Sequence, residues 1–81
     1  MEITFPGETR CLVTLKGVQY RIELGFCQVY RGERHATEAE AEAVSNALRT
    51  AGSTGTYIGP HKRRLTAVAN GVDTWVARGR H

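Results

Sequence analysis

The sequence is poor in the residues that carry catalysis, metal binding or membrane insertion. Among 81 residues it has two cysteines, three histidines, one tryptophan and one methionine. No apolar stretch approaches the roughly 20 residues that a membrane-spanning helix requires. The stretch 1–8 also lacks the basic and apolar regions of a secretory signal. We therefore expect a protein that is made and used in the cytoplasm, with no membrane partner.

The cysteines and histidines show no spacing typical of metal ligands. Cys11 and Cys27 lie in two strand-like segments without C-x-x-C spacing, so we expect reduced thiols in or beside the core. A disulfide would form only if the strands bring the two together. Segment 52–56 is rich in glycine and hydroxyl side chains but lacks the Lys-Ser/Thr of a P-loop. With no nucleophile–base arrangement, the sequence predicts a binding protein without metal, cofactor or catalytic site.

The short length and ordinary composition indicate one globular domain. The chain is 41% hydrophobic and 23% charged, so it has enough apolar surface to fold. We expect a single domain over residues 1–81, with a frayed tail at 78–81. A domain of this size buries only about 60–65% of the surface of its unfolded chain. Its thin core is therefore as compatible with a small homo-oligomer as with a monomer.

Strand-like patterns occupy the first third of the chain. Residues 10–15 are rich in strand formers, and residues 18–24 alternate between apolar and polar side chains. Lys16-Gly17 between them suits a tight hairpin turn, because glycine accepts a positive φ. Residues 26–31 fit either a continuation of the second strand beyond a bulge or a third strand.

The clearest helix signal lies in the middle of the chain. Thr37 and Glu40 have the spacing of a capping box, in which each side chain satisfies a free backbone N–H of the other residue. Gly52 is placed to end the helix. Between these points runs an apolar stripe made largely of alanine: Val44, Ala47, Leu48 and Ala51.

Beyond this helix the pattern predicts strands again. Residues 56–58 are a candidate short strand, and residues 65–69 and 72–77 a candidate hairpin. Asn70-Gly71 between them is the dipeptide most typical of a two-residue hairpin turn. The sequence therefore predicts an α+β fold, a single antiparallel β-sheet with one α-helix packed on one face, in the order β-β-(β)-α-β-β.

Positive charge is concentrated in the last part of the chain. Residues 1–48 hold five Lys/Arg and seven Asp/Glu, a net −2, whereas residues 49–81 hold six Lys/Arg and one Asp, a net +5. Such asymmetry indicates an anionic partner for one end of the domain. Four consecutive basic side chains are placed to contact phosphates: His61, Lys62, Arg63 and Arg64. The same run also fits a solvated turn that binds nothing.

Aromatic side chains are candidates for stacking on nucleic-acid bases. Tyr57 and Tyr30 would supply flat surfaces beside the cations, and each also fits the rim of the core. Trp75 and Tyr20 lie in alternating segments, which favours core packing. His35 precedes the helix cap, so we expect it at the surface.

The predicted helix and the segment before it add charges of both signs. Glu38 and Glu42 suit the positive end of the helix and would also offer an acidic patch to a basic partner. Arg31 and Arg34, just before the helix, complete the candidate set of partner-binding residues. An acidic helix together with a basic strand suits a mixed-charge protein interface.

Stretches 20–24, 30–34 and 37–43 together resemble the arm-type DNA-binding domains of phage tyrosine recombinases. The resemblance implies a three-stranded sheet that enters the major groove, backed by one helix. The strand-then-helix layout is also similar to that of the double-stranded-RNA-binding domain. The chain differs from both because its helix begins with glutamates and strands are predicted after it. If nucleic acid binds, segment 61–64 is therefore a better candidate than this helix.

In size and architecture the chain is also similar to small phage proteins such as the anti-CRISPR proteins. This resemblance implies an inhibitor or adaptor, encoded by a phage or mobile element, that docks on a protein or nucleoprotein complex. That is our first hypothesis. The alternative is a domain that binds DNA or RNA through segment 61–64 and the sheet face. A third hypothesis is a structural or assembly subunit that pairs through an exposed strand edge.

Overall fold

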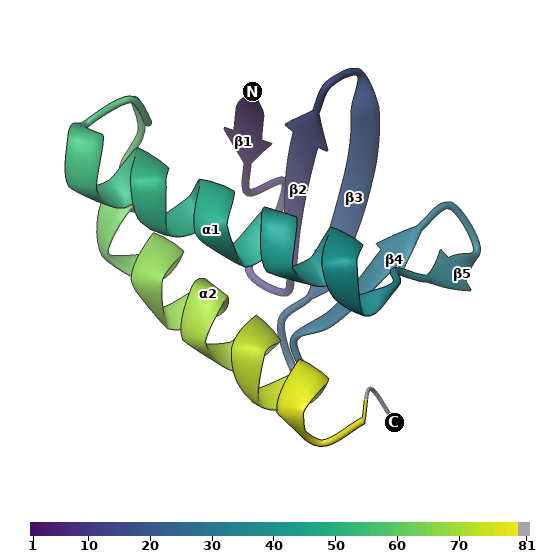
Figure 1. Ribbon diagram of the computed structural model, residues 1–81. Coiled ribbons are helices and arrows are strands. Elements are labelled where there is room, and N and C mark those ends of the chain that lie inside the picture. The colour runs from purple at the N-terminus through teal and green to yellow at the C-terminus, as the bar shows by residue number, and fades with distance from the viewer. Residues whose placement is uncertain (80–81) are drawn as a thin grey trace.

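The computed structural model describes residues 1–79, which form a five-stranded antiparallel sheet followed by two helices (Figure 1). The strands pair in chain order: β1 (Glu2–Thr4), β2 (Arg10–Leu15), β3 (Val18–Glu23), β4 (Gln28–Arg31) and β5 (Arg34–His35). The helices are α1 (Glu38–Thr54) and α2 (Lys62–Ala77). They pack against each other and on one face of the sheet (Figure 1). The predicted α+β class and antiparallel sheet are confirmed, but the prediction of a single helix is wrong.

The β2–β3 hairpin follows the sequence pattern closely. Lys16 and Gly17 both have positive φ, 50° and 81°, as a two-residue hairpin turn requires. The register pairs Val13 with Tyr20, and both side chains are buried against the helices. Of the two alternatives for residues 26–31, the structure has a separate strand, β4, which begins only at Gln28, after a turn that follows β3.

Two short edge strands complete the sheet on either side of this hairpin. β1 pairs with β2 over three residues, and β5 pairs with β4 over two. Neither strand is long enough to show an alternating pattern, so neither was predicted from the sequence. Each edge strand forms through its backbone pairing with the neighbouring strand, β2 or β4.

The first helix begins where the sequence predicts and ends later. The Thr37 hydroxyl accepts from the Glu40 N–H, and the Glu40 carboxylate accepts from the Thr37 N–H, so the capping box is complete. The helix runs past Gly52, which lies against Leu65 of α2. It ends at Gly55, whose φ of 71° supplies the left-handed residue that terminates many helices.

The predicted C-terminal hairpin is wrong, because its two halves form one continuous helix, α2. The apolar residues recur every three or four positions and are all buried on one side: Leu65, Val68, Ala69, Val72 and Trp75. Gly71 permits close packing here rather than a turn. A Cβ at this position would lie 2.2 Å from the Sγ atom of Cys27. The glycine therefore lets α2 approach the turn between β3 and β4.

The core lies between the sheet and the two helices. Trp75 and Tyr20 are 4% and 7% exposed, which confirms both as core residues. Residues 56–58, predicted as a short strand, join no ladder and belong to the connection between the helices. At the end of α2 the Arg78 and Gly79 N–H groups still donate to carbonyls of the helix. Arg80 and His81, the rest of the predicted frayed tail, lie outside the described residues.

No helix within residues 1–79 is long and apolar enough to cross a lipid bilayer.

Candidate functional site

The basic run 61–64, which directly precedes the strand predicted at 65–69, forms the start of α2. His61 is the N-cap residue, and its side chain makes no capping hydrogen bond. Three cationic residues occupy the first turn, which contains no acidic residue: Lys62, Arg63 and Arg64. The free N–H groups of a first helical turn already carry a partial positive charge. Side chains and backbone therefore both present positive charge here.

The first turns of the two helices carry side-chain charges of opposite sign. Glu38 and Glu40 lie in the first turn of α1, where the helix dipole stabilises negative charge. α2 places Lys62 and Arg64 in the same positions relative to its own start, with Arg63 between them. A charge of the unfavourable sign at a helix end costs about 0.3–1 kcal/mol. An anion bound at the start of α2 would offset that cost.

The aromatic ring of Phe5 anchors the start of α2 to the loop between β1 and β2. The Arg64 guanidinium lies over this ring, 4.5 Å from its centroid, and donates to the Glu8 carbonyl at 3.1 Å. The rings of His61 and Tyr57 lie 5.1 and 6.3 Å from that of Phe5. Three of the predicted site residues therefore meet at Phe5, which was not among the residues predicted from the sequence.

The remaining cations of α2 are free to meet a partner. Lys62 and Arg63 are exposed, and neither pairs with a carboxylate among residues 1–79. Arg78, just beyond the other end of the helix, is also exposed and has no carboxylate partner within the described chain. A helix of 16 residues is about 24 Å long, so the free charges lie at both ends of a long surface.

Arg31 and Arg34, predicted as partner-binding residues, pair with a carboxylate in the first turn of α1. Their guanidinium groups lie 2.8 and 3.0 Å from the Glu40 carboxylate. Hydrogen bonds from Arg34, from the Thr37 backbone and from Arg31 hold the pKa of Glu40 well below its usual range. Because the same carboxylate completes the capping box, this ion cluster fixes the β4–β5 hairpin to α1.

Glu38 and Glu42 are exposed and take part in no ion pair within residues 1–79. They lie near the start of α1, whereas the basic run lies at the opposite end of the helix pair (Figure 1). The structure therefore separates the predicted acidic patch from the predicted basic patch.

The face of the sheet that the helices leave uncovered carries a mixed row of side chains. Arg21 and Tyr30 are direct cross-strand neighbours on this face, and Tyr30 pairs in turn with His35 at the sheet edge, whose ring also lies 5.7 Å from that of Trp75 in α2. The Arg21 guanidinium lies 4.7 Å from the Tyr30 ring centroid, and the Tyr30 and His35 rings are also 4.7 Å apart. Glu23 pairs with both Arg10 and Arg21 on this face. The positive charge of the sheet face is thus largely compensated internally, unlike that of α2.

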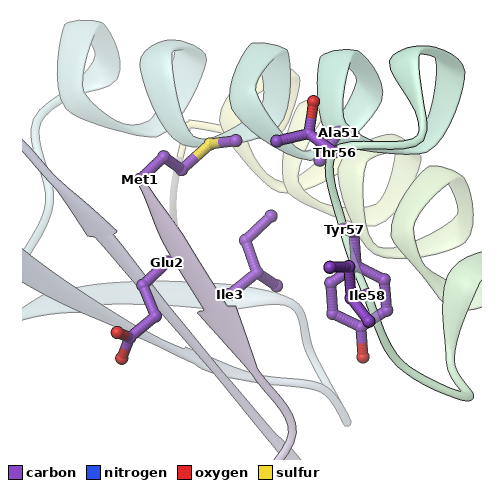
Figure 2. A pocket seen from close by; sticks show the side chains of 7 residues that line it. All are labelled: Met1, Glu2, Ile3, Ala51, Thr56, Tyr57 and Ile58. Atoms are coloured by element: carbon purple, nitrogen blue, oxygen red, sulfur yellow. The ribbon is translucent and has the colours of Figure 1, made fainter.

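Two hollows interrupt the surface beside β1. The smaller, of about 180 Å³, lies between β1 and the connection between the helices (Figure 2). Ile3 and Tyr57 face it, and Ile58 beside them is 96% exposed. The larger is an apolar groove of about 620 Å³ between α1 and the β2–β3 hairpin. Its apolar lining consists of Met1, Leu15, Val18, Tyr20, Ala43 and Ala47.

Neither cysteine thiol lies in an environment that favours the reactive thiolate. Both cysteines are free, Cys11 buried and Cys27 half-buried. Burial raises the pKa of Cys11 to about 12, although the positive charge of Arg64 partly opposes this. Burial also raises the pKa of Cys27. Within residues 1–79, no group of three or more His, Cys, Asp or Glu side chains is placed to hold a metal ion.

Comparison with protein-family models, curated proteins and solved structures found no match to this chain.

Proposed function

We propose that this chain is a non-catalytic binding domain that holds the phosphate backbone of a nucleic acid, free or within a nucleoprotein complex. The contact is made by the basic first turn of α2. The observation that carries the proposal is the exposure of Lys62 and Arg63, without carboxylate partners in the described chain, at the positive end of a helix.

The chemistry of the first turn suits phosphate oxygens. Arg63 can donate two parallel N–H bonds to one phosphate, and Lys62 adds a compact charge. The exposed backbone N–H groups of the turn point toward the same anion. Arg64 contributes by position instead, because its contacts with Phe5 and Glu8 hold the turn against the β1–β2 loop.

The experiment measures binding of the full chain to mixed-sequence DNA and RNA at about 50 mM salt by fluorescence anisotropy. The test variant is Lys62→Ala/Arg63→Ala. A matched control, Lys16→Ala/Arg10→Ala, removes one lysine and one arginine from the β2–β3 hairpin. We expect the test variant to lose affinity by on the order of 100-fold, because two phosphate contacts and their released counterions are lost. The control should bind close to wild type.

An equal loss in both double variants would contradict the proposal, since net charge rather than position would then govern binding. Absence of binding by the wild-type chain at low salt would contradict it outright.

The apolar groove between α1 and the β2–β3 hairpin favours a second candidate function, docking on another protein as an inhibitor or adaptor. This groove is lined mainly by apolar side chains and adjoins the hollow beside the exposed Ile58, with Met1 shared by both. Exposed apolar surface of this kind is typical of protein contacts. A protein partner would bury it with its own apolar side chains.

Variants separate the two candidates. A protein partner bound in the groove should co-purify with wild type and with Lys62→Ala/Arg63→Ala, and should be lost on Ala47→Glu. If Ala47→Glu retains the partner, the groove is not the docking site. Circular dichroism of Ala47→Glu provides the necessary control for folding.

A further inference from the structure

The solvent-exposed side of α2 forms one continuous surface. With 3.6 residues per turn, the exposed positions of this helix and of Arg78, its C-cap, span an arc of about 160° centred on Asn70. The buried positions occupy the opposite arc and pack on α1 and the sheet. We call the exposed set the α2 face: Lys62, Arg63, Thr66, Ala67, Asn70, Thr74, Ala77 and Arg78.

The composition of the α2 face combines small or polar side chains with cations at its two ends. Thr66, Asn70 and Thr74 lie one turn apart along the middle of the face, and Ala67 lies between the first two. No Asp or Glu belongs to the face. Asp73 is only half-exposed and so is not in this set, but it lies within the same arc, between Lys62 and Thr66, and its carboxylate is paired with the guanidinium of Arg49 from α1. The face as a whole is therefore positively charged.

The exposed side of α1 provides an internal comparison. It carries Glu38 and Glu42 and has no exposed cation. Both helices have exposed alanines at mid-helix positions, Ala43 in α1 and Ala67 in α2. Helix length and small residues are thus shared by the two helices, and charge complementarity to a polyanion distinguishes α2 alone.

We propose that the α2 face lies in the major groove of duplex DNA. The inference rests on the proposed function and adds the form of nucleic acid and the contacting surface. The major groove of B-DNA is about 12 Å wide and admits one α-helix. Small side chains such as Ala67 and Thr66 let the helix axis come close to the bases, while Lys62, Arg63 and Arg78 meet phosphates on the groove walls.

The middle of the face carries groups that can contact base edges. Thr66 has a free hydroxyl that can donate or accept, and its methyl group can meet a thymine methyl. The Asn70 side-chain oxygen accepts from Arg49 at 2.9 Å, which leaves its NH₂ group pointing away from that bond with donors for a base acceptor. Arg49 therefore orients Asn70 while neutralising Asp73.

The α2 face fits duplex DNA better than duplex RNA. An A-form RNA helix has a deep and narrow major groove that a protein helix does not enter. A single strand has no groove, and its bases are held by stacking on exposed aromatic rings, which the α2 face lacks. The form of the nucleic acid is thus a direct test of the inference.

The experiment compares Ala67→Glu with Ala39→Glu, two substitutions of an exposed alanine within a helix that change net charge equally. The probes are a mixed-sequence DNA duplex, the RNA duplex of the same sequence and one DNA strand alone. Circular dichroism and thermal unfolding check that both variants fold. We expect wild type to favour the DNA duplex, Ala67→Glu to lose at least about 10-fold in affinity for it, and Ala39→Glu to bind as wild type does.

Two results would overturn the inference while leaving the proposed function intact. One is Ala67→Glu binding the DNA duplex as tightly as Ala39→Glu while Lys62→Ala/Arg63→Ala still loses affinity. The other is a wild-type preference for the RNA duplex or the single strand. If wild type bound none of the three probes, both the inference and the proposed function would fall.

Discussion

Gly71, in the middle of α2, faces the thiol of Cys27, and its replacement by alanine tests how closely the helix packs on the β3–β4 turn. The added Cβ would lie 2.2 Å from Sγ and 3.0 Å from Cβ of Cys27. The first distance is far inside van der Waals contact, so either the helix or the turn must move. Overpacking of this kind costs about 1–3 kcal/mol.

The net effect of Gly71→Ala includes a favourable contribution as well. Alanine is better than glycine inside a helix by about 1 kcal/mol. Taking the upper end of the overpacking range because the overlap is severe, we expect a net loss of about 2 kcal/mol in the free energy of unfolding. For a domain of this size, that loss lowers the melting temperature by about 8–16 °C.

A second substitution makes the prediction specific to the packing described. Cys27 has a φ of 52°, which glycine adopts without strain, so Cys27→Gly removes the obstacle and keeps the turn. In that background Gly71→Ala should stabilise the protein by about 1 kcal/mol, a reversal of sign and a coupling of about 3 kcal/mol.

The assay for this cycle is chemical unfolding of the four proteins, followed by circular dichroism. Loss of stability by the same amount in both backgrounds would refute the contact between α2 and Cys27. It would instead favour a turn at Asn70-Gly71, where glycine is needed for its backbone conformation.

Three further predictions concern stability and thiol chemistry. Because the folded pKa of Glu40 lies below its ordinary value near 4.5, its stabilising effect is complete above that pH and is lost as the pH falls through the acid range. Urea unfolding should therefore show less acid destabilisation in Glu40→Gln than in wild type, and an identical pH dependence would contradict the ion cluster. Thr37→Ala should cost about 1 kcal/mol by the same assay, and no change would argue against the capping box. With a thiol-specific reagent at mildly alkaline pH, Cys27 should react before Cys11, which should react only on unfolding because burial raises its pKa to about 12. Equal rates for the two thiols in the folded protein would contradict this.

The parts of the fold that local chemistry dictates were predicted correctly. The Lys16-Gly17 turn and the Thr37–Glu40 capping box depend only on neighbouring residues, and both are present in the structure. The end of α1 was misplaced because Gly52 and Gly55 offer the same signal. Helix–helix packing at Gly52 decides between them, and this packing is not local.

The error at α2 has a specific physical cause. Asn70-Gly71 is a strong hairpin signal, and it outweighed a helical spacing of apolar residues that was also present in the sequence. Glycine inside a helix is intrinsically unfavourable, but position 71 requires it because Cys27 occupies the space where a side chain would be. That requirement arises from tertiary packing, so only the three-dimensional structure reveals it.

The contacts of the candidate residues follow from the sequence only in part. The sequence singled out the run 61–64, but it did not distinguish the free Lys62 and Arg63 from Arg64, which packs on Phe5. Phe5 itself carried no signal, because its role depends on segments far apart in the sequence. Arg31 and Arg34 were selected for their charge alone and are engaged by Glu40.

The salt dependence of DNA binding tests the central claim most directly. Lys62, Arg63 and Arg78 are the described cations proposed to meet phosphates. A plot of log affinity against log salt for the DNA duplex should therefore have a slope of about −2.7. Lys62→Ala/Arg63→Ala should reduce the slope to about −0.9, while Lys16→Ala/Arg10→Ala should leave it unchanged. The same slope in wild type and in Lys62→Ala/Arg63→Ala would show that α2 does not hold the phosphate backbone, and would contradict the account.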